Sequence, residues 1–275
     1  MSGIYSQVPM PYSVRTRNIS IASDNKIHDD DIAARHGFRG GLVAGTLMYA
    51  HMTTPVVARL GPDWLHRGRG SLRLLNPAFD GEELSVHLGG DGPALHAQLY
   101  NEANEELAQL NCDLPDPLPT PAPWAARSPA PHTERAPITW EAVREDMAFM
   151  AFPWRPDAAA NRDWCEAAGD TLPLYQEGAT PHLHPGLVLQ AVNAVFGNHF
   201  ILNPWIHVGS EIQHRAPLFV GDAIEVRAVV TEKKERKGHQ FITYHASLWK
   251  EGASDAGPAV EVTHTAIFRV RTVAD

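Results

Sequence analysis

The sequence predicts an α+β fold in which one unit, a long buried helix followed by antiparallel strands, occurs twice in tandem. Two long apolar runs, beginning near residues 42 and 186, each precede a series of short alternating segments. The turn motif P-x-F-x-G-[DE]-x-[LI]-x-V stands at residues 77–86 and again at residues 217–226. A repeated order of elements that contains a repeated turn indicates duplication of one α+β unit.

The first unit begins with an alternating segment, residues 12–22, which predicts extended structure. Residues 32–36 predict a short helix, and glycines at positions 37, 40 and 41 then supply a tight bend before the long helix. That helix is apolar on nearly all sides from Leu42 to Met52, so we expect it to lie in the core. Four strands are predicted after it: residues 71–75, 83–88, 95–101 and 106–112.

Proline dominates residues 114–137, which predicts an extended linker between a first domain (1–113) and a second domain (138–275). The second domain begins with a helical insertion, for which we predict short helices at residues 139–150 and 157–168. A second long helix opens with Gly186-Leu187-Val188, which we align with Gly41-Leu42-Val43 of the first. The predicted strands of this half are residues 206–214, 223–232, 240–249 and 260–270.

Composition excludes several classes of partner and site. The net charge of −9 and the pI near 5.9 argue against a nucleic acid or an anionic membrane as partner. Only Cys112 and Cys165 are present, too few for a disulfide framework or a zinc site. No run of about 18 apolar residues predicts a transmembrane helix, and the first residues lack a secretory pattern. We therefore expect a cytoplasmic protein.

A polar cluster lies just before the first long helix and is the candidate site. It contains Asp24, Asn25 and His28, followed by three acidic residues, 29–31. Side chains in such a place can move protons while free N–H groups at the helix start hold an anionic oxygen. The three acidic residues are interpreted as caps of the short helix, and a metal site that they form with His28 is the alternative.

The stretch DNKIHDDDIAARHGFRGGLVAGTLMYA resembles the motif of MaoC-like dehydratases and (R)-specific enoyl-CoA hydratases. The chain differs from the family pattern in having Ser23 where the family aspartate stands, with Asp24 one place later. It also has Lys26 in place of a proline and Ala44 in place of the histidine before the helix glycine. The residues that match the family pattern are Asn25, Ile27, His28, Ala33, Gly37, Phe38 and Gly45.

The resemblance implies a tandem, or double, hotdog fold, in which each half wraps an antiparallel β-sheet around a long central helix. It implies a lyase that hydrates or dehydrates an enoyl or 3-hydroxyacyl thioester without a metal or redox cofactor. The substrate would be a small acyl thioester, with coenzyme A as its carrier, and the chain would form a homodimer or a higher homo-oligomer.

The resemblance also assigns roles to residues. His28 and Asp24 would be the acid/base pair, and Asn25 would hold them in position. Gly45 and Thr46 would bind the substrate oxygen at the helix start, although Gly45 has the alternative role of letting the helix pack closely. His184 and Gly186, at the start of the second long helix, would line the acyl pocket, or His184 would only cap that helix.

Two other functions stay open at this point. A hotdog thioesterase would use a carboxylate to activate water against the thioester carbonyl carbon. A hotdog protein that binds an acyl ligand without catalysis would fit the displaced aspartate.

Overall fold

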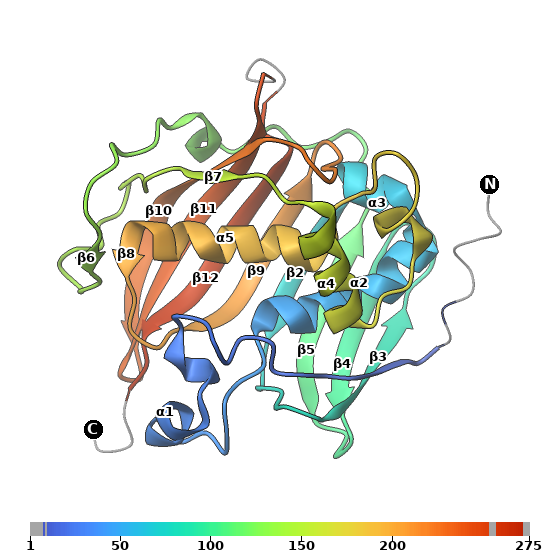
Figure 1. Ribbon diagram of the computed structural model, residues 1–275, viewed down its shortest axis with the longest axis horizontal. Helices are drawn as coiled ribbons and strands as arrows, with labels where there is room; N and C mark the ends of the chain where they lie inside the picture. The colour runs from blue at the N-terminus through green and yellow to red at the C-terminus, as the bar shows by residue number, and fades with distance from the viewer. Residues whose placement is uncertain (1–7, 9, 253–256, 272–275) are drawn as a thin grey trace.

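The computed structural model describes residue 8, residues 10–252 and residues 257–271 (Figure 1). In this part of the chain ten strands form one sheet, in the order β1-β3-β4-β5-β2-β9-β12-β11-β10-β7. All neighbouring strands in that sheet are antiparallel. The two halves of the chain therefore share a single sheet, which joins them at the β2–β9 pair, where Ser71 lies opposite Glu211.

The elements follow the predicted order. The first half contains β1 (Tyr12–Arg15), η1 (Lys26–His28), α1 (Asp30–Arg35), α2 (Gly45–Leu60), α3 (Pro62–Arg67), β2 (Arg69–Leu74), β3 (Glu83–Gly89), β4 (Leu95–Asn101) and β5 (Glu106–Asp113). The connecting segment and the insertion contain η2 (Pro123–Ala126), β6 (Ala136–Pro137), β7 (Phe152–Trp154), α4 (Ala158–Ala168) and η3 (Pro173–Tyr175). The second half contains α5 (Pro185–His199), β8 (Phe200–Ile201), β9 (Ile206–His214), β10 (Ile224–Arg236), β11 (His239–Lys250) and β12 (Val260–Arg269).

The repeated turn motif makes the same contacts in both halves. Leu42 forms an antiparallel bridge to Phe79, and His182 forms the same bridge to Phe219. Leu42 and His182 are 140 residues apart in the sequence, and so are Phe79 and Phe219. The glycines of the two turns, Gly81 and Gly221, have positive φ angles of 76° and 86°, which favour glycine over residues with a side chain. Residue n of the first half thus corresponds to residue n + 140 of the second.

This register corrects the predicted alignment of Gly41-Leu42-Val43 with Gly186-Leu187-Val188, which is wrong by five residues. The structure instead aligns Ala44 with His184, and both residues are N-caps of their helices. The two glycines that suggested the alignment serve different packing needs. A Cβ on Gly41 would lie 2.1 Å from the carbonyl oxygen of His28, whereas a Cβ on Gly186 would lie 2.7 Å from the Cβ of Ala50.

The predicted helix at residues 139–150 is also wrong, because its second half pairs with the outer strand β10. Phe149 N–H donates to the carbonyl of Ala228 at 2.8 Å, and Val230 N–H donates to the carbonyl of Met147 at 2.9 Å. The edge of β10 would otherwise present unpaired backbone groups, and pairing outweighs the helical preference of this segment. The predicted helix at residues 157–168 is confirmed as α4, with Asp157 as its N-cap.

The proline-rich segment 114–137 lies along the second half. Its Ala122 N–H donates to the Glu261 carboxylate at 2.8 Å, and its Pro119 carbonyl accepts from Arg215 at 2.6 Å. Glu261 and Arg215 also form an ion pair. Proline leaves its carbonyl free to accept, so side chains of the sheet hold the part of this segment that precedes its short pairing with β8 at Ala136–Pro137.

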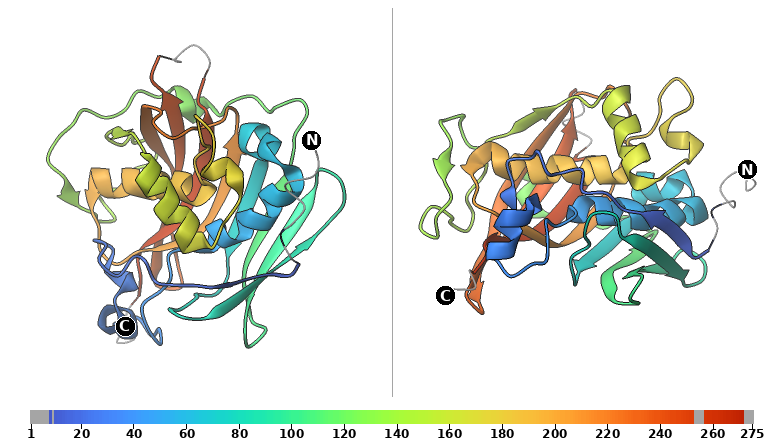
Figure 2. Two further views of the ribbon diagram at one scale, coloured as in Figure 1. Left: turned by 45° about the vertical axis from the view of Figure 1, so that its right-hand side comes forward. Right: turned by 60° about the horizontal axis from the view of Figure 1, so that its bottom comes forward.

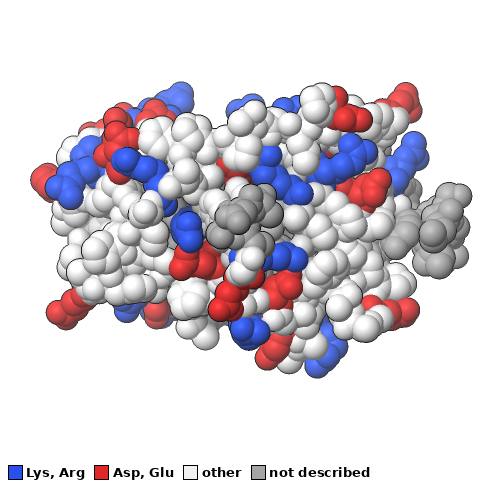
Figure 3. All heavy atoms as spheres, turned by 90° about the horizontal axis from the view of Figure 1, so that it is seen from above, with Lys and Arg blue, Asp and Glu red and all other residues white. Residues whose placement is uncertain are grey.

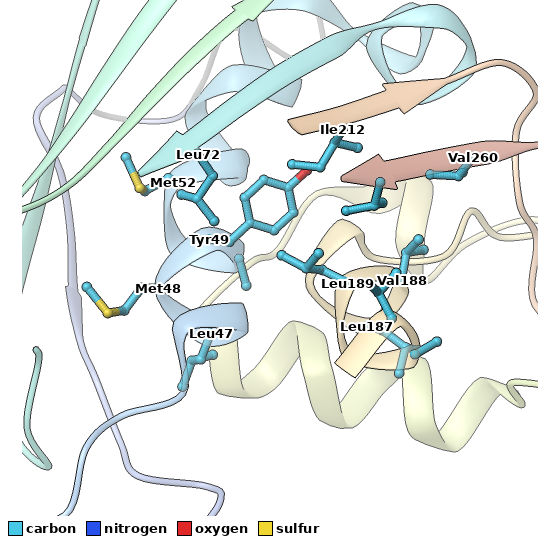
Figure 4. Packing of buried hydrophobic residues seen from close by; sticks show 14 of the residues in the cluster. Leu47, Met48, Tyr49, Met52, Leu72, Leu187, Val188, Leu189, Ile212 and Val260 are labelled. Atoms are coloured by element: carbon cyan, nitrogen blue, oxygen red, sulfur yellow. The ribbon is translucent and has the colours of Figure 1, made fainter. Parts of the chain in front are cut away.

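The hydrophobic core is continuous across the two halves. Helix α5 lies across β9 to β12 in Figure 1, and α2 packs directly against α5. Figure 4 shows the ring of Tyr49 from α2 between the side chains of Leu72 on β2 and Ile212 on β9, where the halves meet. The two further views in Figure 2 show α4 packed beside the two long helices. The main core is therefore built from both halves.

The described helices include none that is both long and apolar enough to span a membrane. On the face shown in Figure 3, acidic and basic side chains are interspersed, and no large region of one sign is visible.

The close approach of α2 and α5 gives a test of the packing. Gly186→Ala should destabilise the protein by about 1–3 kcal/mol, because the new methyl group overlaps Ala50 and Trp164. The matched control is Gly197→Ala on the same helix, where the nearest atom, Leu202 Cδ1, lies 3.9 Å away. That change should stabilise the helix by about 0.5–1 kcal/mol. Chemical denaturation measures both, and equal stabilities for the two variants would contradict the described contact.

Candidate active site

A cavity of about 890 Å³ lies between the start of α2, one side of α5 and the loop that precedes α1. Both halves of the chain supply its walls. The polar residues among those that line it are Ser20, Ser23, Asp24, Asn25, His28, Asn76, Arg135, Gln190, Asn193, Asn198, His207 and His239. Apolar side chains such as Met48, Leu74 and Phe200 complete the lining. A concave, largely apolar space with a few converging polar groups is the usual form of a small-molecule site.

His28 has one nitrogen committed to the backbone and one directed elsewhere. Its Nδ1 lies 2.6 Å from the carbonyl oxygen of Leu42. A carbonyl only accepts hydrogen bonds, so Nδ1 carries the ring hydrogen and Nε2 keeps its lone pair. Burial lowers the pKa of His28 below its usual value, and the hydrogen bond to Leu42 opposes this in part. The ring is therefore a neutral base on the cavity wall.

The loop that carries His28 is clamped against the segment that leads into α2. Leu42 N–H donates to the carbonyl of Ile27 at 3.2 Å, and Gly41 N–H donates to the Asp30 carboxylate at 2.7 Å. Asn18 Nδ2 donates to the carbonyl of His28 at 2.8 Å. The space at Gly41 is closed by that same carbonyl, so any side chain there would push the loop away. The position of His28 thus depends on local contacts on both of its sides.

Asn25 ties this loop to the second half of the chain. Its Oδ1 accepts from Trp205 N–H at 3.1 Å, and its Nδ2 donates to the Trp205 carbonyl at 2.9 Å. The same Nδ2 lies 3.4 Å from His28 Nε2. The Asn25 side chain therefore joins the loop that carries His28 to the segment before β9, and its amide donates to the unprotonated Nε2 of His28.

Asp24 lies on the cavity lining, but its side chain is exposed. Within the described residues, no hydrogen bond joins its carboxylate to His28 or to any other group. The neighbouring acidic residues have structural contacts: Asp29 Oδ1 caps α1 by accepting from Ile32 N–H at 3.0 Å, and Asp30 holds Gly41. The structure therefore places Asp24 in the cavity without pairing it with the imidazole.

The start of α2 opens onto the cavity. Its N-cap, Ala44, has no side chain that can accept a hydrogen bond, and both Ala44 and Gly45 line the cavity. The first N–H groups of a helix have no partner within the helix, and together with the helix dipole they attract a negative oxygen. A Cβ on Gly45 would lie 2.4 Å from Leu74 and 2.9 Å from His207, so glycine is also required here by packing.

Thr46 is fully buried and is absent from the lining of the cavity. Its hydroxyl donates to Gln190 Oε1 on α5 at 3.1 Å. This hydrogen bond connects the start of the first long helix with the cavity-facing side of the second. The side chain of Thr46 therefore orients Gln190, and only its backbone N–H remains available near the opening.

The N-terminus of α5, which corresponds to the start of α2, is capped by a side chain. His184 Nδ1 accepts from Gly186 N–H at 3.1 Å, and His184 Nε2 lies 3.3 Å from the buried carboxylate of Asp170. Neither His184 nor Gly186 lines the cavity, since His184 is fully buried and Gly186 packs against Ala50. His184 and Gly186 therefore do not line this cavity, contrary to the prediction, and His184 is the N-cap of α5.

Sequence reasoning missed the residues that the second half contributes. Gln190, Asn193 and Asn198 follow one side of α5 at helical spacing, and His207 is the second residue of β9. The i, i+3, i+8 spacing of the three amides on an otherwise apolar helix was the one available signal. His207 has no such signal, because it is a single polar residue in a strand far from the motif.

Solved structures with the same architecture were found, although no family model and no curated protein match the sequence. Rv0216 of Mycobacterium tuberculosis, described as a double hotdog protein, aligns with a TM-score of 0.67 at 12% identity. The alignment covers 95% of this chain and 94% of that protein. This likeness over nearly the whole of both chains decides the architecture. The fold is a double hotdog.

Other solved structures that align over nearly the whole chain carry enzyme names. A protein from Chloroflexus aurantiacus J-10-fl, assigned provisionally as a MaoC domain dehydratase, aligns with a TM-score of 0.65 at 12% identity. The alignment covers 94% of this chain and 93% of that one. A provisionally assigned oleoyl thioesterase from Lactobacillus plantarum aligns with a TM-score of 0.52 at 10% identity, over 96% and 98% of the two chains. At these identities the double hotdog fold is shared, and the chemistry must be argued from the site.

The Asn25 contact leads to a testable prediction. Asn25→Leu should lower the free energy of unfolding by about 1–3 kcal/mol, because both polar groups of the Trp205 backbone lose their partner. Lys26→Ala is the matched control on the adjacent residue, whose exposed Nζ donates to the carbonyl of Ser23. It should change stability by less than about 0.5 kcal/mol. Denaturant titration measures both free energies of unfolding. An Asn25→Leu variant as stable as the wild type would contradict the role of Asn25 in joining the two halves.

Proposed function

We propose that this protein adds water to the double bond of an enoyl thioester, or removes it from a 3-hydroxyacyl thioester. One observation carries the proposal: a neutral imidazole with the lone pair on Nε2 and the uncapped start of α2 line the same cavity. A base for water and donors for an enolate oxygen are the two requirements of this reaction. The likeness to MaoC-type double hotdog structures supports the same reading.

In the proposed reaction, His28 Nε2 takes a proton from water as the water oxygen bonds to the β-carbon of the thioester. The electron pair of the double bond shifts to the α-carbon and the carbonyl, and the resulting enolate oxygen lies at the N–H groups of Gly45 and Thr46. The proton held by His28 then goes to the α-carbon, which completes the addition. Asp24, on the cavity lining, would orient the water.

A thioesterase would attack the carbonyl carbon instead and needs a carboxylate beside it. Among the described residues that line the cavity, Asp24 is the only carboxylate, and it is exposed. The proposal includes coenzyme A as the thioester carrier and a homodimer or higher oligomer as the assembly, both of which follow from the family resemblance. Incubation with crotonyl-CoA separates the functions: loss of enoyl absorbance indicates hydration, free thiol indicates a thioesterase, and thermal stabilisation alone indicates a binding protein.

Replacing His28 should remove catalysis. His28→Ala should lower kcat for the hydration of crotonyl-CoA by about 10²–10⁴-fold, because general base catalysis is lost. His87→Ala, which alters an exposed histidine on β3 outside the cavity, is the control and should keep the wild-type rate. Circular dichroism verifies that both variants are folded. A folded His28→Ala enzyme with the wild-type rate would show that His28 is not the catalytic base.

The rate should also depend on pH in a defined direction. The base must be unprotonated, and the pKa of His28 lies below the usual value of about 6.5 because the ring is buried. We therefore expect kcat/KM to be constant above pH 6.5 and to fall only as the pH drops through the lowered pKa. A profile of kcat/KM from mildly acidic to mildly basic pH measures this. An acid limb centred above pH 6.5 would contradict a buried His28 as the base.

A further inference from the structure

A chain of three buried polar side chains runs from the cavity into the sheet of the second half. His207 Nε2 lies 2.9 Å from Ser210 Oγ, and Ser210 Oγ lies 3.0 Å from His264 Nδ1. The two imidazole rings are stacked, with centroids 4.1 Å apart. All three residues are buried, with relative exposures of 6%, 3% and 0%. A polar chain of this kind inside a sheet is costly to bury and needs all its hydrogen bonds.

The chain ends in an unpartnered nitrogen on the cavity wall. His207 lines the cavity, and within the described residues its Nδ1 has no hydrogen-bond partner. A methyl group on the Cα of Gly45 would lie 2.9 Å from that nitrogen, so Nδ1 is directly beside the first residue of α2. A buried nitrogen without a partner is costly, and a bound oxygen atom in the cavity would remove that cost.

The hydroxyl of Ser210 lies between the two rings, and the distances allow its hydrogen bonds to run in either direction. Burial lowers the pKa of His207 to about 3 and lowers that of His264 as well, so both rings are neutral. Ser210 has one hydrogen to donate, and its oxygen can accept one in return. When Ser210 accepts from His264 Nδ1–H and donates to His207 Nε2, the ring hydrogen of His207 is on Nδ1 and faces the cavity.

We propose that His207 is a catalytic residue whose Nδ1–H donates to the thioester carbonyl oxygen, beside the N–H groups at the start of α2. This role rests on the proposed function, since it adds a side-chain donor to the oxygen that the N–H groups of Gly45 and Thr46 bind. The donor comes from the second half of the chain, whereas the base comes from the first. Ser210 and His264 are positioning residues that keep the hydrogen on Nδ1.

The two halves bring these groups together through contacts already described. Asn25 contacts His28 and also holds the backbone of Trp205, which is two residues before His207. The base and the proposed side-chain donor are therefore linked by a single amide side chain. His28 protonates and deprotonates, while His207 stays neutral and only donates.

The test compares His207→Leu with a matched change of another buried histidine on β9. His214→Leu is the control, because His214 is also buried but packs on Trp64 outside the cavity. With crotonyl-CoA, His207→Leu should lower kcat about 10²–10³-fold with little change in KM, as for loss of one oxyanion donor. His214→Leu should keep kcat. His207→Asn, whose amide N–H replaces the donor near the Nδ1 position, should recover part of the rate.

A binding measurement separates this inference from the proposed function. Acetoacetyl-CoA forms an enolate that absorbs in the near ultraviolet, and binding at oxygen donors should raise that absorbance in the wild type and in His214→Leu. The absorbance should be lost in His207→Leu even if crotonyl-CoA is not hydrated at all. Hydration that depends on His28 but not on His207 would overturn the inference alone. Absence of any enolate signal in a wild type that also fails to hydrate would overturn both.

If His207→Leu does not fold, the Ser210→Ala variant tests the inference instead. It leaves both rings in place but removes the hydroxyl that keeps hydrogen on His207 Nδ1, and it should lower kcat about tenfold, the worth of one neutral hydrogen bond. A Ser210→Ala enzyme with the wild-type kcat and the wild-type enolate absorbance would overturn the inference.

Discussion

The hydrogen bond from His28 Nδ1 to the Leu42 carbonyl is the contact on which the candidate site depends. It fixes the tautomer, since a carbonyl can only accept, and it fixes the distance between the imidazole and the start of α2, which begins three residues after Leu42. The surrounding contacts serve this one bond. Gly41 has no side chain because the His28 carbonyl occupies that space, and Asp30 holds the Gly41 N–H. A short segment of chain thereby sets both the base and its protonation.

Much of the fold was predictable because its signals are local. Alternating strands and the repeated turn at Gly81 and Gly221 depend on neighbouring residues, and they gave the order of elements and the duplication. The register between the halves was not predictable from the helix glycines. Gly41 leaves space for a carbonyl and Gly186 leaves space for another helix, so glycine is required at the two positions for different reasons. The segment before β7 could likewise be assigned only once the edge of β10 was known.

The site could be predicted only as far as its local motif extends. Asn25, His28 and Gly45 were singled out from one stretch, and all three line the cavity. The opposite wall consists of side chains from α5 and β9, more than 140 residues away in sequence, which no pattern near the motif could indicate. His207 is a single histidine in a strand, and only the sheet pairing that places β9 beside β2 brings it to the start of α2.

The two helix starts have opposite character, and this asymmetry has a consequence for how such a chain can evolve. Position 44 bears alanine and leaves α2 open, whereas its counterpart at position 184 bears a histidine that closes α5. In a homodimer of identical subunits every substitution appears twice, so one helix cannot be opened while its twin is sealed. Fusion of the two units in one polypeptide lifts that symmetry. One unit can then lose its open helix start and still supply side chains to the wall of the cavity.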